Sequence, residues 1–364
     1  MQKTPLYEAH VKSGARIIDF GGWLMPVQYS SILDEHQTTR TSVTLFDTCH
    51  MGEFTVEGKD ALDFLQYALA ADFSKLESGQ AKYSFLLNEN GGVIDDLIVF
   101  KKSLNEYMVC VNAGTILNDF QHFTQRAGNF EVCLKNVSSE TAKIDVQGPK
   151  TESLMKKFIT GALPERFTFR NDSILGIPVI LSRTGYTGED GVELFFASEN
   201  AEKLWYALLE AGKEFGAIPA GLGARDSLRL EAGYPLYGHE LTEKITPLEA
   251  GLNFAVNLNK DKFIGKAALT ALKEKGLARK LVALEINDKG IPREGYEIIA
   301  ESKTVGYVTS GTFSPTFKKG IAMAYIDTDQ AKENSEINVK IRNNLHKATI
   351  KKKPLYPFKG VQNS

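Results

Sequence analysis

The sequence predicts an α+β protein with mainly antiparallel sheets and more than one domain. A chain of 364 residues is too long for one ordinary hydrophobic core, so two or three domains are expected. Apolar runs flank Gly-bearing turns, as is typical of hairpins. The last part of the chain has many short strand patterns with turns between them, which favours a small barrel or a sandwich.

Composition excludes several classes of protein. Apolar residues make up 43% and charged residues 24%, which is typical of a soluble globular chain. The net charge of −2 gives no support to nucleic-acid binding. No apolar run approaches the roughly 18–20 residues of a membrane helix, and the N-terminus lacks an apolar signal core, so a cytoplasmic protein is expected. The three cysteines form no CxxC pair and the histidines no HExxH, so neither a disulfide framework nor a metal site is expected.

Residues 53–138 predict a compact α+β unit with a mainly antiparallel sheet. Strands are expected at EFTVEG (53–58), YSFLL (83–87), VIDDLIVF (93–100), EYMVCVN (106–112) and NFEVCLKNVS (129–138), and helices at 60–70 and 116–125. The second helix has Thr115 as its N-cap and Gly128 as its stop signal.

The rest of the chain divides into a second block, a connector and a strand-rich end. Another hairpin is predicted at GIPVILSRTGYTGEDGVELFF (176–196). Helices are expected at 199–214 and 220–232. Residues 252–276 are expected to form a connector that ends in a helix. From about residue 279, strands are expected at LVALEI, YEIIA, KTVGYVTSG, IAMAYID, EINVKIRN and HKATIKKK.

The first hairpin carries two acids inside an apolar strand, NENGGVIDDLIVF (88–100). Side chains alternate along a strand, so Asp95 and Asp96 point to opposite faces, and at least one meets an apolar layer or a cavity. A buried carboxylate either finds hydrogen-bond donors or takes up a proton. One interpretation is a structural acid that caps a turn or pairs with a surface lysine. The other is an acid held in a cleft for proton transfer or substrate orientation.

The second hairpin repeats this pattern. Glu193 lies between Val192 and Leu194, so it faces away from their layer, either to solvent or to a cavity. Tyr186 lies between Gly185 and Gly188, where an aromatic ring either packs in the turn or stacks on a flat ligand.

AGLGARDSLRLEAGYPLYG (220–238) begins with glycines but lacks the third glycine of a dinucleotide fingerprint. Asp226 is spaced to pair with Arg229 on one helix face, which leaves Arg225 available for an anion or a carbonyl oxygen. A purely structural helix is the alternative. Five lysines near the C-terminus predict a solvated strand end or a docking patch for an acidic partner: Lys347, Lys351, Lys352, Lys353 and Lys359.

The order of the motifs is more specific than any one of them. Along essentially the whole chain they are TPLYEAH, DFGGWLMPVQY, FDTCHMGEF, NENGGVIDDLIV, QGP (147–149), SRTGYTGEDGVEL, PAGLGARDSLRLEAGYPLYG, FIGKAAL and TSGTFSP. Together they closely resemble the aminomethyltransferase of the glycine cleavage system, the T-protein family.

The resemblance implies a three-domain cloverleaf with tetrahydrofolate in a central hole. A discontinuous folate-binding α+β domain is expected at 1–52 plus 139–250. A ferredoxin-like α+β domain is inserted at 53–138, residues 251–278 form the connector, and a β-barrel occupies 279–364. Both acid-bearing hairpins then face the shared hole.

The resemblance also implies the reaction. A lipoylated carrier, the H-protein, delivers an aminomethyl group, and tetrahydrofolate attacks its methylene carbon. Ammonia, 5,10-methylenetetrahydrofolate and the dihydrolipoyl carrier are released, with no metal and no flavin. Asp96 matches the catalytic aspartate, which accepts or relays a proton or stabilises developing positive charge. Asp95 is expected to be its structural neighbour.

The remaining site residues also follow from the resemblance. Glu193 is expected to bind the amino and ring N–H groups of the pterin. Arg225 is expected near the folate or the lipoyl arm. The folate pocket is expected to be lined by Tyr83, Asn112, Tyr186, Tyr234 and Met51.

The sequence departs from the family pattern in two places. Cys49 stands where the family usually has serine, which puts a thiol beside a pocket motif. The tail KPLYPFKGVQNS matches the family poorly, although Tyr356 or Lys359 would be placed to reach the folate tail.

The rival interpretations are other folate-dependent enzymes of the same superfamily and a folate-binding assembly protein. A folate-dependent demethylase of a sulfonium compound would have a similar pocket. Folate-linked amine oxidases add a flavin domain, for which this chain has no room. The folate-binding assembly protein for iron–sulfur enzymes carries K-G-C-Y-x-G-Q-E, where this chain has RTGYTGEDGVE.

Overall fold

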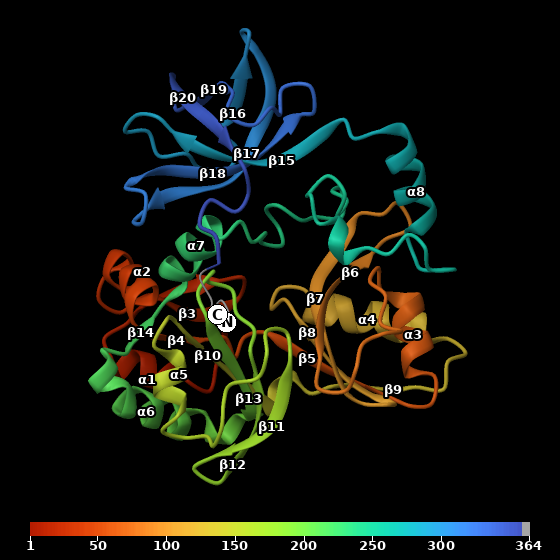
Figure 1. Cartoon of the computed structure of the whole chain (residues 1–364), viewed down its shortest axis with the longest axis vertical. Coiled ribbons are helices and arrows are strands. Elements are labelled where there is room, and N and C mark those ends of the chain that lie inside the picture. The colour runs from red at the N-terminus through yellow and green to blue at the C-terminus, as the bar shows by residue number, and fades with distance from the viewer. Residues whose placement is uncertain (359–364) are drawn as a thin grey trace.

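The computed structural model describes residues 1–358, which form three lobes, each built on its own sheet (Figure 1). The lobes carry a six-stranded sheet, a five-stranded sheet and a closed six-stranded barrel, and a three-stranded sheet lies beside the first. The small sheet consists of β1 (Gln2–Lys3), β3 (Trp23–Gln28) and β2 (Arg16–Phe20). The predicted α+β class with antiparallel sheets is confirmed.

The six-stranded sheet joins the N-terminal segment to a block much later in the chain. Its order is β11 (Phe169–Ile174), β12 (Ile177–Ser182), β13 (Gly191–Ala197), β10 (Thr141–Gln147), β4 (Thr44–Asp47) and β14 (Ile218–Ala220). Since β4 lies between β10 and β14, we propose that 1–52 and 139–250 form one discontinuous domain.

Helices pack on both faces of this sheet. On one face, α1 (Tyr7–Lys12), α5 (Thr151–Met155) and α6 (Ala201–Gly212) contribute to a shared core. On the other face, Ala224 and Leu228 of α7 (Leu222–Glu231) cluster with Phe46 of β4, and α2 (Ile32–Thr41) lies beside α7. Ile144 of β10 and Leu194 of β13 share a core with Trp205 of α6. Because side chains alternate along a strand, the residues between them point to the opposite face.

The five-stranded sheet carries the first hairpin. Its order is β6 (Ala81–Leu87), β7 (Val93–Ser103), β8 (Glu106–Val111), β5 (Gly52–Glu57) and β9 (Cys133–Asn136), with every pair antiparallel. The aromatic side chains of α3 (Ala61–Ala68) and α4 (Ile116–Ala127) contribute to its core. In the turn, Asn88 Oδ1 accepts the backbone N–H groups of Asn90 and Gly92, both at 3.0 Å, as expected for an Asn-Gly turn.

The last predicted strand of this unit is shorter than expected. It spans Cys133–Asn136 instead of 129–138. Gly128 ends α4 with φ +45°, and Phe130 then packs against Phe64 and Tyr67. The first residues of the apolar run therefore cover the helices and do not join the sheet.

The C-terminal strands close into a barrel. Of the two architectures predicted from the sequence, the barrel is therefore observed and the sandwich is not. The strand order is β15 (Arg279–Ile286), β18 (Lys319–Asp327), β17 (Lys303–Ser314), β16 (Glu297–Ala300), β19 (Glu336–Ile341) and β20 (Asn344–Lys351). The connector ends in α8 (Lys266–Lys275), as predicted.

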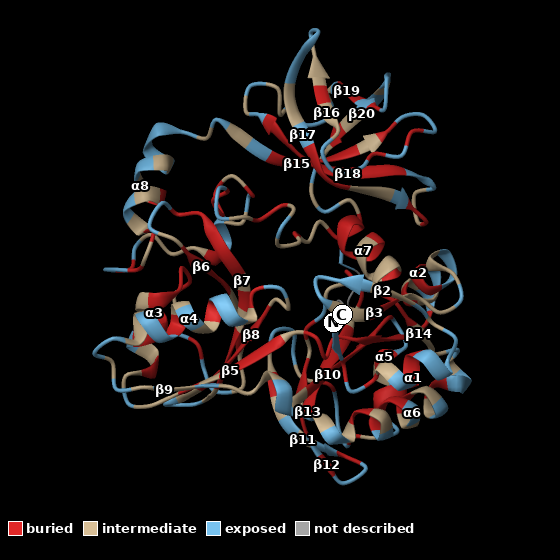
Figure 2. Cartoon of the chain, turned by 180° about the vertical axis from the view of Figure 1, so that it is seen from behind, coloured by how far each residue is buried: buried red, intermediate tan, exposed pale blue. Residues whose placement is uncertain are grey.

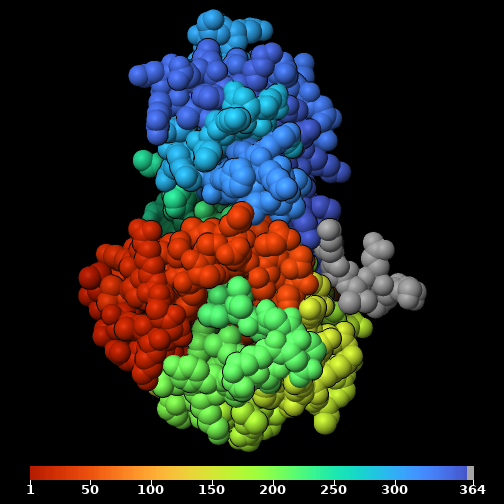
Figure 3. Space-filling view, turned by 90° about the vertical axis from the view of Figure 1, so that its left-hand side faces the viewer, coloured from red at the N-terminus to blue at the C-terminus, as the bar shows by residue number. Residues whose placement is uncertain are grey.

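The lobes meet through shared buried contacts. One hydrophobic cluster combines Phe85 of β6, Leu248 of the segment that follows α7, and Met323 of β18. The buried residues in Figure 2 run along the central strands and through α7. Figure 3 shows the barrel lying against the N-terminal segment. The two parts are joined by a hydrogen bond between His36 Nε2 and Thr316 Oγ1, which are 3.1 Å apart. Among residues 1–358, no helix has the length and apolar character needed to cross a membrane.

Candidate active site

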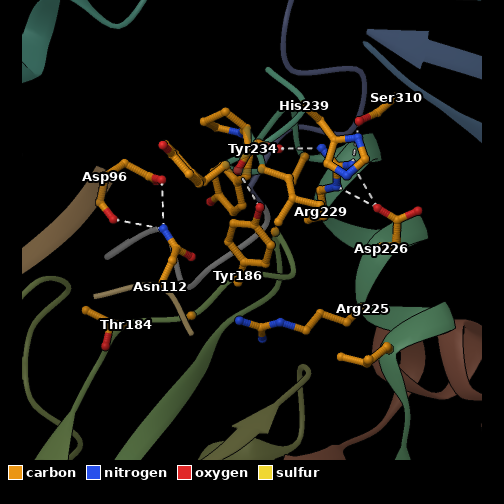
Figure 4. Close-up of a pocket in the computed structure, with 18 of the residues that line it drawn as sticks. Asp96, Asn112, Thr184, Tyr186, Arg225, Asp226, Arg229, Tyr234, His239 and Ser310 are labelled. Carbon is orange, nitrogen blue, oxygen red and sulfur yellow. Dashed lines mark hydrogen bonds and ion pairs between the residues drawn. The ribbon is translucent and has the colours of Figure 1, made fainter. Parts of the chain in front are cut away.

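A cavity of about 1200 Å³ lies where the three lobes meet (Figure 4). Its wall combines both hairpins, α7, the connector, the barrel residues Thr309–Gly311 and the C-terminal segment up to Phe358. The cavity brings together all eight residues expected from the sequence: Asp96, Glu193, Arg225, Tyr83, Asn112, Tyr186, Tyr234 and Met51. Tyr356 also lines it, whereas Lys359 lies outside the described residues.

Asp96 is held by two hydrogen-bond donors at the cavity wall. Tyr83 Oη donates to one carboxyl oxygen at 2.8 Å, and Asn112 Nδ2 donates to the other at 2.9 Å. Burial, and then the neighbouring Asp95, raise the pKa of Asp96 to about 7, although both hydrogen bonds act in the opposite direction. A carboxyl group with this pKa can both take up and release a proton near neutral pH.

Asp95 lies on the other face of β7, towards α4. It is fully buried and accepts the backbone N–H and the side-chain amide of Asn112, at 3.0 and 2.8 Å. Burial and the adjacent Asp119 raise the pKa of Asp95, and burial raises that of Asp119 to about 7. Asn112 thus links a buried acid pair to Asp96, and the predicted opposite orientation of the two aspartates is observed.

Glu193 is buried and is part of a row of alternating charges. Lys143 Nζ donates to Glu193 Oε1 and to Asp145 Oδ1, both at 2.6 Å. Arg225 Nη1 donates to the second oxygen of Asp145 at 3.0 Å. Thr184 Oγ1 donates to the second oxygen of Glu193. The solvent-facing alternative for Glu193 is therefore wrong.

The register of the sheet explains this row. Asp145 lies directly opposite Glu193 in the β10–β13 ladder, and Lys143 is two residues away on the same face. Sequence reasoning missed Lys143 and Asp145. The signal was present in AKIDVQ (142–147), where charged residues alternate with apolar ones as they would on a strand with one polar face.

Arg225 is not left unpaired, contrary to expectation. Besides its ion pair with Asp145, its guanidinium lies 4.7 Å from the centre of the Tyr186 ring. The predicted pair of Asp226 and Arg229 is present at 2.8 Å. Arg229 also donates to Glu240 at 2.8 Å. Its bond to Ser310 of the barrel, at 2.7 Å, crosses the cavity wall in Figure 4.

Aromatic rings provide flat surfaces in the cavity wall. Tyr186 and Tyr234 are stacked with centroids 5.8 Å apart, and Tyr186 Oη donates to the carbonyl of Pro235. Tyr83 and Phe254 are stacked at 6.2 Å, although Phe254 is 75% exposed. Flat ligands bind between such surfaces.

His50 and Met51 bring the loop after β4 into the cavity wall. His50 Nδ1 is buried and has no hydrogen-bond partner within residues 1–358. Burial lowers the pKa of His50 to about 4, so the imidazole is neutral at physiological pH. Cys49, the departure from the family pattern, is buried, lies 3.3 Å from the carbonyl oxygen of Lys143, and does not line the cavity.

The C-terminal segment closes one side of the cavity. Lys353 Nζ donates to the carbonyl of Ala250 at 2.9 Å, and burial lowers the pKa of Lys353 to about 8. Arg166 lies 3.8 Å from the centre of the Phe358 ring. Lys353 is therefore part of the cavity wall and not of a solvated strand end. Within the part of the chain that is described, no group of His, Cys, Asp and Glu is arranged to hold a metal ion.

Comparisons with known proteins cover nearly the whole chain. Residues 6–260 match the GCVT N-terminal domain family, and residues 279–357 match the glycine cleavage T-protein C-terminal barrel domain. An aminomethyltransferase of Caldanaerobacter subterraneus is 51% identical over 98% of this chain and 96% of its own, and one of a Thermoanaerobacter species is 49% identical over 98% of both. A crystal structure of glycine cleavage system aminomethyltransferase T from Bartonella henselae superposes with a TM-score of 0.92 at 34% identity, over 98% of this chain and 99% of that one.

Proposed function

The chain belongs to the aminomethyltransferase family of the glycine cleavage system and is a transferase of that system. From this premise we propose that it transfers the methylene carbon of an aminomethyl-lipoyl H-protein to tetrahydrofolate. The products are 5,10-methylenetetrahydrofolate, ammonia and the dihydrolipoyl carrier.

The chemistry of the cavity wall supports tetrahydrofolate as the acceptor. A reduced pterin is a flat ring system with adjacent N–H donors on one edge. The stacked pairs Tyr186–Tyr234 and Tyr83–Phe254 offer surfaces for such a ring. Glu193, at the end of the charge row, offers carboxylate oxygens to the N–H edge. The cavity volume lies slightly above the range of roughly 300–1,000 Å³ for small-molecule sites, which suits a ligand of this size plus a reactive arm.

One observation carries the proposed chemistry, namely the environment of Asp96. Transfer of the methylene group breaks two N–H bonds of tetrahydrofolate, and the two protons end on the lipoyl sulfur and on ammonia. A group that accepts and returns a proton near neutral pH is therefore needed. Asp96 has a pKa of about 7 and a fixed orientation, because Tyr83 and Asn112 each bind one of its oxygens. Its carboxylate form also stabilises positive charge on the methylene carbon.

The proposal is tested by turnover with a loaded carrier. The protein is mixed with tetrahydrofolate and an aminomethyl-loaded lipoyl H-protein, and methylenetetrahydrofolate and ammonia are measured together. Equal amounts of both products are expected. Tight folate binding without either product would overturn the proposed donor, and failure to bind folate at all would overturn the acceptor.

A further inference from the structure

Lys143 is a lysine ammonium buried in the wall of the cavity, and nothing in the proposed reaction uses it. Lys143 is 2% exposed, and its Nζ lies between the carboxylates of Asp145 and Glu193. Burial alone would lower the pKa of Lys143, but the charges of Asp145 and Glu193 outweigh it and hold the pKa above its ordinary value. Lys143 is therefore a permanent positive charge inside the wall.

All three donors of this ammonium are already used. Two bind Asp145 and Glu193 at 2.6 Å, and the third points to Thr48 Oγ1 at 3.3 Å. An ammonium group has three N–H bonds and no acceptor. Lys143 therefore has no donor left for a ligand, and any effect on binding passes through its neighbours.

The two carboxylates depend on Lys143 to different degrees. Asp145 also accepts Arg225 at 3.0 Å and Thr48 at 2.8 Å. The only other side-chain partner of Glu193 within residues 1–358 is the hydroxyl of Thr184. Without Lys143, Asp145 would keep a counter-charge and Glu193 would lose its own.

Other ionisable groups around Glu193 do not replace that counter-charge. Glu53 of β5 and Cys110 of β8 are buried, and burial raises the pKa of both, so they are neutral or negative. His50 is neutral above its lowered pKa of about 4. Arg225 is bound to Asp145.

We propose that Lys143 is a positioning residue for the ligand-binding carboxylate Glu193, keeping it charged and aimed at the paired N–H groups of the ligand. This inference rests on the proposed function, in which Glu193 binds the N–H edge of the pterin. A carboxylate accepts two N–H bonds, whereas a protonated carboxyl presents one donor and one acceptor to the same edge. A buried carboxylate that has lost its counter-charge takes up a proton as the pH falls.

The test is the affinity for 5-formyltetrahydrofolate, a stable ligand with the same pterin edge, measured by calorimetry from pH 5.5 to 8.5. Lys143→Met is expected to weaken binding by roughly 10- to 100-fold, because it removes one partner of a buried charge pair. The ratio of the variant and wild-type dissociation constants should grow as the pH falls. Lys143→Arg, which keeps the charge, should restore a ratio that does not change with pH.

Two controls separate positioning from general damage. Lys260→Met removes another buried lysine, whose Nζ binds the carbonyls of Leu69 and Ala71 outside the cavity wall, and should not change the pH profile. A ligand that lacks the 2-amino group should lose little affinity on Lys143→Met, because it lacks one of the paired donors. If Lys143→Met does not fold, Lys143→Gln removes the charge while keeping a donor and is expected to show the same pH-dependent loss.

The outcomes distinguish this inference from the proposed function. If the wild type does not bind the folate, the proposed acceptor is wrong. If the wild type binds and the Lys143→Met ratio is constant across the pH range, or the loss is equal for the ligand without the amino group, Lys143 does not act through Glu193.

Discussion

At the scale of single residues, neighbouring carboxyl groups acquire different properties from their surroundings. Asp95 and Asp96 are adjacent in the sequence, but alternation along β7 sends one towards α4 and the other into the cavity. Asn112 binds both at 2.8 and 2.9 Å, so the orientation of Asp96 depends on the buried pair behind it. The catalytic assignment of Asp96 remains a prediction, with a direct test.

Asp96→Asn keeps the shape of the side chain but removes its ability to accept and release a proton. We expect turnover to fall by roughly 10²- to 10⁴-fold, the usual contribution of a positioned acid or base, while folate still binds. Steady-state rates and equilibrium binding measure the two effects separately. Asp172→Asn, on β11 away from the cavity, is the matched control and should leave both unchanged. A large loss of affinity with normal turnover would contradict the catalytic role.

The buried pair of Asp95 and Asp119 makes stability depend on pH. Both pKa values are raised in the folded chain, that of Asp119 to about 7, so the folded state binds more protons than the unfolded state above about pH 4. The stability that these groups contribute therefore falls as the pH rises from about 4 to 7.

Asp119→Asn removes one of the two charges and supplies an amide donor for Asp95. We expect its free energy of unfolding to rise relative to wild type, by about 1–2 kcal/mol more at pH 8 than at pH 5. Urea denaturation at the two pH values measures this difference. The exposed Asp63→Asn on α3 is the control, and parallel behaviour of the two variants would refute the explanation.

At the scale of elements, two arginines one turn apart on α7 make different contacts, one at the cavity and one with the barrel. Arg225 closes the charge row at the cavity, where it meets Asp145 and Tyr186. Arg229 is buried and joins the helix to Glu240 and to Ser310 of β17. The helix thus holds the barrel and the six-stranded sheet at a fixed separation across the cavity.

Arg229→Met should destabilise the protein strongly, because Glu240 would be left as a buried charge without its partner. Breaking such a pair costs about 3–5 kcal/mol, and the double variant Arg229→Met with Glu240→Gln should recover part of this loss. Chemical denaturation of the single and double variants measures the coupling. Additive losses would show that the two side chains stabilise the fold independently.

At the scale of the whole molecule, no single lobe contains the cavity. Its walls come from the inserted unit, the six-stranded sheet, α7, the connector, the barrel and the C-terminal segment. A ligand that fills it contacts elements far apart in the sequence. Binding and the mutual arrangement of the lobes are therefore coupled.

Folate binding should accordingly stabilise all three lobes together. At a free ligand concentration 100 times the dissociation constant, the expected gain is about 2.7 kcal/mol. Hydrogen exchange should slow at the ends of β7 and β8, along β13, and at residues 309–311 of the barrel. Protection confined to one sheet would contradict a ligand site shared by the lobes.

The sequence by itself determined the local elements and identified the acids that needed an explanation. The Asn-Gly turn at 88–92, the stop at Gly128 and the alternating strands depend on neighbouring residues, so their prediction succeeded. Asp96 and Glu193 stood out because each interrupts an apolar strand. Tyr186 stood out at its Gly-flanked turn, whereas Tyr83 and Tyr234 came from the resemblance to the family.

The tertiary structure alone decided which charges meet. Arg225 was expected to be unpaired, but the register of β10 against β13 and the position of α7 bring Asp145 within 3.0 Å of it. The same register puts Lys143 beside Glu193. A shift of one residue would turn these side chains to the opposite face, so a pairing between distant strands cannot be derived from either strand alone. The charge row around Glu193 exists only once the sheet has formed.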